Sequence, residues 1–192
     1  SMAMLTIAAS VLTTGNIKAD EKDTTNETNT ATESKYANKA VADIYSTTTL
    51  NIRKKGSINA KIVGKMKKGN IATVLKKGSE WSKVRSGNVT GYVKNQYLVF
   101  GDEIENFAKQ NVKKVAKVQT ETLRVRKKAS TDSKIVTLVS EDDKLKVKKQ
   151  TNDWAKVKVD GQTGYVSKDY AKVTYSFGKA KSMKQIQAEQ AA

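Results

Sequence analysis

The sequence predicts an all-β fold of two small barrels in tandem, joined by a short α-helix and preceded by a disordered N-terminal segment. Two observations lead to this prediction: the chain repeats itself internally, and the apolar residues of each repeat come in short runs between turn-forming residues. With 192 residues, of which 38% are hydrophobic and 6% aromatic, the chain is long enough for two domains with modest cores.

The repeat contains no gap and spans most of each expected barrel. Residues 45–98 align with residues 118–171 at a constant offset of 73, with 20 identities in 54 positions. The identities include the motifs Arg-Lys-Lys, Trp-x-Lys-Val and Thr-Gly-Tyr-Val. We therefore expect a first barrel at residues 45–100 and a second at residues 118–177.

Within each repeat the apolar runs are too short for helices. The first barrel is expected to contain five strands, at residues 50–52, 62–63, 71–75, 81–84 and 91–93. In the second barrel, Leu145 and Val147 alternate with lysines, which is typical of a half-buried strand.

Two segments outside the repeat have helical character. Residues 101–117 are predicted to form the connecting helix, in which Asp102 caps the N-terminus and one face is apolar. That face consists of Ile104, Phe107, Ala108 and Val112. Residues 178–192 have Met183 and Ile186 on one side, and we expect either a helical linker to a missing C-terminal domain or a frayed tail.

The first 44 residues differ in composition from the rest. Residues 1–19 hold an apolar stretch that ends at Ala19 and has Lys18 as its only charged side chain, as expected for the remnant of a secretory signal peptide. This stretch is too short and too polar to span a membrane. Residues 20–44 are polar and low in complexity, so we expect a disordered linker.

Composition excludes several classes of chemistry. The chain has no Cys, no His and no Pro, so it offers no Cys-His pair, no Ser-His-Asp triad, no disulfide and no zinc or haem site with the usual ligands. Glu80 is the only acidic residue of the first barrel, and residues 141–143 lack the spacing of a calcium loop. We expect a non-enzymatic chain without cofactor or metal.

The order of the motifs resembles the bacterial SH3-like (SH3b) domain family. Each repeat reads Thr-x-Leu-x-hydrophobic-Arg, then a hydrophobic pair, then Trp-x-Lys-Val, and finally Gly-Tyr-Val followed by Tyr. The family commonly has a proline in the turn after the arginine, whereas residues 53–57 read Arg-Lys-Lys-Gly-Ser. That departure affects the expected turn conformation, not the domain assignment.

The resemblance implies a targeting module of exported bacterial proteins. Such modules bind the cell wall or position a peptidoglycan hydrolase, and tandem copies often precede an NlpC-type domain. We therefore expect a secreted, wall-associated chain from a Gram-positive-like bacterium. Its expected partners are peptidoglycan or teichoic acid and a covalently linked C-terminal catalytic domain. The alternative is a basic module for single-stranded nucleic acid or another polyanion, since the sequence pI is about 9.8, although aromatic residues are sparse.

Charge gives a first set of candidate ligand-binding residues. The first barrel carries +11 of the net charge of +17. Its lysines gather in expected turns, and the candidates are Lys54, Lys55, Lys67, Lys68, Lys76 and Lys77. They predict either a polyanion contact that weakens with salt or simply a solvated, solubilising surface.

Arginines and aromatic residues give a second set, formed by Arg53, Trp81 and Tyr97 in the first barrel and by Arg126, Trp154 and Tyr170 in the second. The tryptophans are expected to cover the core, with stacking on a sugar ring as the alternative. The polar ends of the arginines and tyrosines either line a groove or satisfy nearby backbone carbonyls.

Overall fold

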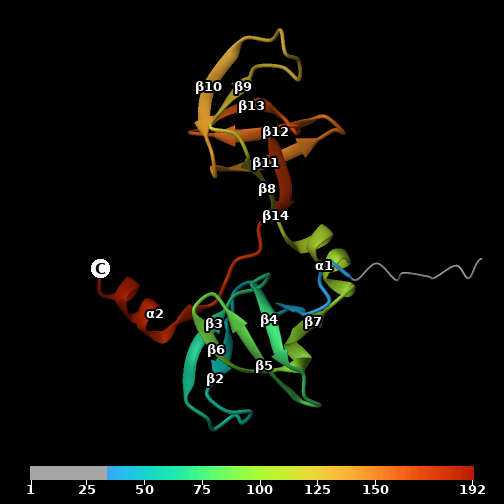
Figure 1. Cartoon of the computed structure of the whole chain (residues 1–192). Coiled ribbons are helices and arrows are strands. Elements are labelled where there is room, and N and C mark those ends of the chain that lie inside the picture. The colour runs from blue at the N-terminus through green and yellow to red at the C-terminus, as the bar shows by residue number, and fades with distance from the viewer. Residues whose placement is uncertain (1–33) are drawn as a thin grey trace, which may run out of the picture. The chain divides into compact units, whose positions relative to one another are not determined.

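The computed structural model describes residues 34–192 and confirms the all-β class, with one eight-stranded and one seven-stranded sheet (Figure 1). The expected signal-peptide remnant at residues 1–19 and residues 20–33 of the expected linker lie outside the described residues. Among residues 34–192, no helix is both long and apolar enough to cross a bilayer.

The first barrel contains seven strands of its own. They are β1 (Lys39–Ala42), β2 (Leu50–Arg53), β3 (Ile62–Met66), β4 (Ile71–Lys76), β5 (Trp81–Ser86), β6 (Val89–Lys94) and β7 (Leu98–Phe100), with a 3₁₀ turn η1 (Asn95–Tyr97) before β7. All neighbouring strands are antiparallel, in the order β3-β2-β6-β5-β4-β1-β7.

The second barrel repeats this arrangement strand for strand. Its strands are β8 (Lys114–Val118), β9 (Thr122–Arg126), β10 (Ile135–Ser140), β11 (Lys144–Gln150), β12 (Trp154–Val159), β13 (Gln162–Ser167) and β14 (Ala171–Tyr175). Their order, β10-β9-β13-β12-β11-β8-β14, is that of the first barrel. The five strands predicted for the first barrel are confirmed as β2 to β6.

The Thr-Gly-Tyr-Val motif allows two strands of each barrel to approach closely. A Cβ atom at Gly91 would lie 2.5 Å from the carbonyl oxygen of Arg53, and one at Gly164 would lie 3.0 Å from that of Arg126. Since real Cβ atoms avoid such contacts, glycine is required where β6 meets β2 and where β13 meets β9.

Each barrel encloses a core of small aliphatic side chains, which matches the low aromatic content. Ile52, Met66, Val84 and Val93 are fully buried in the first barrel, while the fully buried valines of the second barrel are Val118, Val125, Val157 and Val166. Alternation along the strands places these side chains inside and the lysines outside, so each barrel has its own core.

Helix α1 (Glu103–Asn111) follows the first barrel and confirms the predicted apolar face except for Val112, which follows the last helical residue in an extended conformation. Ile104, Phe107 and Ala108 are buried, and a small cluster joins α1 to Tyr36 and to Val41 of β1. The expected side-chain cap by Asp102 is wrong, because Asp102 accepts no cap hydrogen bond and its backbone is already helical.

Two expected boundaries are also wrong. The disordered linker was expected to reach residue 44, yet Lys39–Ala42 form β1 between β4 and β7, and Tyr36 is buried. The connector was expected to run to residue 117, yet β8 begins at Lys114. The apolar residues of β1 and β8 are only one or two valines and alanine, which is too weak a local pattern to predict a strand. These segments are strands because they are buried between two neighbouring strands of a sheet.

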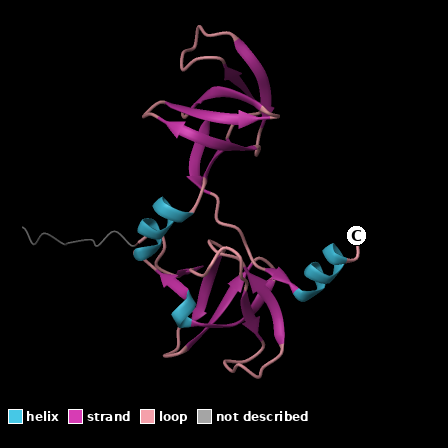
Figure 2. Cartoon of the chain, turned by 180° about the vertical axis from the view of Figure 1, so that it is seen from behind, coloured by secondary structure: helices cyan, strands magenta, loops and turns pink. Residues whose placement is uncertain are grey.

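The C-terminal part of the chain departs most from expectation. The second barrel was expected to extend to residue 177, but β14 ends at Tyr175. Helix α2 (Met183–Gln190) is present and begins with a capping box between Ser182 and Gln185. The residues before it are not a free linker, because Lys181–Ser182 form β15, an eighth strand on the sheet of the first barrel (Figure 2).

Candidate functional site

A groove opens on the surface of the first barrel, where the loop before β2 faces the start of β5 and the turn η1. We call it groove 1; its volume is about 660 Å³. The residues that line it are Asp43, Ile44, Tyr45, Thr48, Thr49, Leu50, Asn51, Arg53, Ile58, Lys68, Trp81, Lys94 and Tyr97. The structure thus brings Arg53, Trp81, Tyr97 and Lys68 together, which the sequence analysis had proposed separately.

An equivalent groove, groove 2, lies at the same place on the second barrel and has a volume of about 270 Å³. Its lining residues are Thr120, Thr122, Leu123, Arg124, Arg126, Thr131, Trp154, Ser167 and Tyr170. Eight of its positions are related to lining positions of groove 1 by the repeat offset of 73. Arg126, Trp154 and Tyr170 therefore meet in the second barrel as their counterparts do in the first.

The two arginines hold the loop that forms one wall of each groove. Arg53 Nη1 donates to the carbonyl oxygen of Ala60 at 2.9 Å, and Arg126 Nη1 donates to that of Ser133 at 2.8 Å. These contacts close residues 54–61 and 127–134, the turns that lack the proline common in the family. The arginines thus satisfy backbone carbonyls and line the grooves at the same time.

The aromatic residues of the grooves differ in exposure. Trp81 and Trp154 are half-buried and do not belong to the buried core clusters. Tyr97 is 39% exposed and Tyr170 is 55% exposed. Each groove is therefore lined by a half-buried indole and an exposed phenol, an apolar surface with polar edges.

Groove 1 is larger because the loop that precedes β2 is longer. Seven residues, 43–49, lie between Ala42 and Leu50, whereas four residues, 119–122, lie between Val118 and Leu123. The longer loop supplies Ile44, Tyr45 and Thr48 to the lining of groove 1. These residues were not predicted, because the ungapped repeat pairs Tyr45 with Val118, whereas in the sheets Val118 takes the place of Ala42.

The charged residues of the two grooves also differ. Besides the arginine that both grooves share, groove 1 contains Asp43, Lys68 and Lys94, and Lys94 pairs with Glu80 at 3.2 Å. In groove 2 the position of Lys94 is occupied by Ser167, whereas Arg124 stands where groove 1 has Asn51. The same scaffold thus presents its cations at different places.

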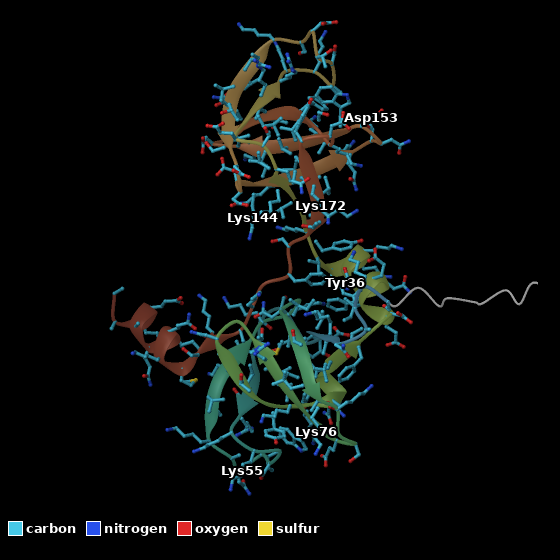
Figure 3. The ribbon with its side chains drawn as sticks, viewed as in Figure 1. Tyr36, Lys55, Lys76, Lys144, Asp153 and Lys172 are labelled. Atoms are coloured by element: carbon cyan, nitrogen blue, oxygen red, sulfur yellow. The ribbon has the colours of Figure 1, made fainter. Side chains whose placement is uncertain are left out.

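The remaining lysine candidates lie outside groove 1. Lys54 and Lys55 are on the β2–β3 loop, Lys67 precedes β4, and Lys76 ends it, so that the labelled Lys55 and Lys76 stand on separate segments in Figure 3. Lys77 Nζ lies 4.1 Å from the ring centre of Phe100, above a second hollow. Of the six lysines, only Lys68 contributes to the groove.

The acidic turn of the second barrel, residues 141–143, is occupied by contacts of its own. Asp142 pairs with Lys117 Nζ at 2.8 Å, and this hydrogen bond lowers the pKa of the Asp142 carboxyl. The Asp143 carboxylate accepts the backbone N–H of Ser140 at 2.8 Å. Within residues 34–192 no three acidic side chains are grouped to hold a metal ion.

Comparison with known proteins extends these observations. A family model described as the bacterial SH3 domain matches residues 48–99 and 121–172. YrvJ of Bacillus subtilis (strain 168), named as a candidate N-acetylmuramoyl-L-alanine amidase, is 30% identical over 127 residues. These are 63% of this chain and 24% of YrvJ, so the chain spans about a quarter of the length of that relative.

Solved structures of NlpC proteins share weaker similarity. An NlpC/P60 family protein from Bacillus cereus ATCC 10987 is 14% identical, with a TM-score of 0.32, over 72% of this chain and 57% of that chain. NlpC2 from Trichomonas vaginalis is 12% identical, with a TM-score of 0.28, over 72% of this chain and 48% of that chain. TM-scores this low do not support a common arrangement, and the family match alone carries the assignment.

The matched residues include all of β2 to β6 and of β9 to β13, and most of the residues that line the two grooves. Because the family model covers both repeats and more than half of the chain, the chain belongs to the bacterial SH3 domain family and contains two copies of the domain.

Proposed function

We propose that this chain is a non-catalytic cell-wall-binding region, in which groove 1 and groove 2 bind components of the wall. One observation carries the proposal: the grooves are more alike than the barrels that hold them. Five of the eight equivalent groove positions are identical, against 20 of the 54 aligned positions. One of the five is the position of the exposed Tyr97 and Tyr170, whose identity core packing does not explain.

The chemistry of the grooves favours a polar ligand with a flat apolar face. A half-buried indole and an exposed phenol suit stacking on a sugar ring or on the apolar part of a short peptide. The threonine hydroxyls at the rim, Thr49 and Thr122, donate and accept hydrogen bonds. Peptidoglycan offers both sugars and stem peptides, so it is the proposed ligand of both grooves.

Charge supports an anionic contribution in the first barrel. Lys68 and Lys94 line groove 1 together with Asp43, and Lys94 pairs with Glu80, on a barrel whose net charge is +11. Carboxylates of the stem peptides or phosphates of teichoic acid have the complementary sign. We propose that this field concentrates the chain at the wall and that binding to the first barrel weakens as salt rises.

The proposed setting is an exported protein with a peptidoglycan hydrolase domain. The relative named for amidase activity is about four times as long as its matched segment, which leaves room there for further domains. This chain has no Cys and no His, so Cys-His chemistry would have to come from a linked domain. The barrels would hold that domain at its substrate.

Co-sedimentation of the full chain with purified sacculi tests the proposal. Binding is measured with and without removal of teichoic acid and across a salt series. The Tyr97→Ala and Tyr170→Ala variants should each weaken binding about 3- to 10-fold, the amount expected for one exposed aromatic contact. Leu138→Ala serves as the control, because Leu138 is 57% exposed and lies outside both grooves.

Failure to sediment with any sacculi would contradict the proposal. The second candidate, a basic module for single-stranded nucleic acid or another polyanion, is favoured by the lysines outside groove 1. Single-stranded DNA is therefore included as a competitor. Binding to DNA alone, insensitive to Tyr97→Ala and Tyr170→Ala and steeply dependent on salt, would support that candidate instead.

A further inference from the structure

Six residues that follow the second barrel are bound to the first. We call residues 177–182 the strap. Lys181 and Ser182 pair antiparallel with Lys65 and Gly64, so β15 extends the first sheet beyond β3. In Figure 1 the chain that leaves β14 reaches α2 beside β3, in agreement with this pairing. The strap therefore crosses from one repeat to the other.

Hydrogen bonds and buried area hold the strap along its length. The backbone N–H of Ile71 donates to the carbonyl oxygen of Gly178 at 2.9 Å, and that of Ala180 donates to Ser86 Oγ at 2.9 Å. Ala180 is only 5% exposed and belongs to the core of the first barrel. Phe177 packs edge-on against Tyr36, with their ring centres 5.9 Å apart.

The first barrel is shaped for this segment at positions where the second barrel is not. A Cβ atom at Gly64 would lie 2.7 Å from Val89 Cγ1 of the barrel itself and 2.8 Å from the carbonyl oxygen of Lys181, and one at Gly87 would lie 3.1 Å from the carbonyl oxygen of Ala180. In the second barrel the equivalent residues are Thr137 and Asp160. Val159 replaces Ser86 there and offers no hydroxyl, so the binding edge belongs to the first barrel alone.

Helix α2 offsets the one unfavourable contact of the strap. Lys181 lies opposite Lys65 in the antiparallel register, which sets two positive charges on neighbouring strands. Lys181 Nζ donates to both carboxylate oxygens of Glu189 in α2, at 2.8 and 2.7 Å. The strap and α2 thus form one binding segment, in which the helix supplies the counter-charge.

We propose that the edge of the first barrel formed by β3, Ser86 and Gly87 is a strand-binding site, and that its ligand is the strap of the same chain. Binding is by β-augmentation, with backbone hydrogen bonds at the edge and a small side chain, Ala180, in a pocket. The second barrel has the same seven strands and no added strand, so the strap is not part of the fold that the two barrels share. The strap is therefore a separable ligand that fixes the start of α2 to the first barrel.

Hydrogen exchange on the full-length Ala180→Asp variant tests the proposal. A carboxylate cannot enter the buried Ala180 position unpaired, so the variant should release the strap. The Ile71 amide, which donates to Gly178, should then exchange about 10- to 100-fold faster, while amides of β12 and β13 keep their protection. Ala188→Asp makes the same change at an exposed position of α2 and should have no effect.

Adding the segment back in trans makes the test decisive. A synthetic peptide of residues 176–190 should restore protection of the Ile71 amide in Ala180→Asp. Because a short tether supplies an effective concentration of about 1 mM, a strap that protects this amide about 10-fold corresponds to a peptide Kd on the order of 0.1 mM. The same peptide with Ala180→Asp should not restore it. If Ala180→Asp unfolds the first barrel, Gly178→Ala is the milder variant, since a Cβ atom there meets Asn70 Nδ2.

Two results would overturn the proposal. One is unchanged protection of the Ile71 amide in both Ala180→Asp and Gly178→Ala, which would mean that the strap is not held. The other is release of the strap without rescue by peptide at millimolar concentration, which would mean that the segment is not a separable ligand.

Discussion

Replacing Gly91 by alanine should strongly destabilise the first barrel. The added Cβ atom would lie 2.5 Å from the carbonyl oxygen of Arg53, 2.8 Å from Ile52 Cγ2 and 3.1 Å from Val63 Cγ2. The carbonyl is backbone next to the pairing of Arg53 with Tyr92, so it cannot retreat without separating β2 from β6. Overpacking of this kind costs about 1–3 kcal/mol, and a contact with backbone belongs at the upper end, about 3 kcal/mol.

A loss of about 3 kcal/mol lowers the Tm of a barrel of this size by about 12 to 24 °C. The assay is urea unfolding of the full chain followed by fluorescence, since Trp81 reports on the first barrel and Trp154 on the second. Amide exchange assigns each transition to its barrel. The transition of the second barrel should stay where it is in the unmodified chain.

Gly101→Ala is the matched control for this prediction. Gly101 has φ of +53°, and no atom lies within 4 Å of the position of its Cβ, so only backbone strain of about 1 kcal/mol is expected. Gly164→Ala should fall between the two, because its closest contact, at 2.5 Å, is the side-chain atom Val125 Cγ1. A loss from Gly91→Ala no larger than that from Gly101→Ala would refute the close-approach argument.

Three further predictions concern single contacts. Arg126→Met removes the hydrogen bond to Ser133, so residues 127–134 should exchange faster and the second barrel should lose about 1–2 kcal/mol, measured by urea unfolding; unchanged exchange in that loop would contradict the role of the arginine. Burial, together with the hydrogen bond to Glu105, raises the pKa of Tyr175 above 10.0. The stability that the protonated Tyr175 hydroxyl contributes is therefore complete below pH 10 and is lost as the pH rises further. Tyr175→Phe should reduce the fall in Tm that accompanies the rise in pH above 10. Lys117 lowers the pKa of Asp142 below 3.8, so the stability that this ion pair contributes is present above about pH 4 and is lost as the pH falls further. Asp142→Asn should therefore reduce the fall in Tm between pH 5 and 2. An unchanged slope would show that the pair does not stabilise the fold.

The elements that the sequence predicts are those whose signals are local. Strands β2 to β6 contain short apolar runs that occur twice, and the apolar face of α1 repeats at helical spacing. Strand β1 has Ala40, Val41 and Ala42 as its only apolar residues, in a polar neighbourhood. It is a strand because β4 and β7 flank it on both sides, and this tertiary pairing has no local trace in the sequence.

The sequence selects several of the residues that line the grooves, but it does not predict that they surround one opening in each barrel. Arg53, Trp81 and Tyr97 are far apart in the chain, and only the curvature of the barrel brings β2, β5 and η1 to one opening. Ile58 and Thr131 line the same openings without being identical, so the repeat gave no reason to select them. Identity between repeats locates the shared part of a site, whereas differences between loops decide its size.

The strap shows where differences between repeats carry structural information. Strand β15 is two residues long, Lys181 and Ser182, and has no pattern that would predict a strand. Its binding edge does leave a trace: Gly64 lies inside β3, where the second repeat has Thr137, and a Cβ atom at Gly64 would meet both Val89 of the barrel and the backbone of Lys181. A glycine inside a strand indicates that another backbone comes close. A glycine present in one copy of a repeat and absent from the other therefore marks a place where one copy has a neighbour that the other lacks.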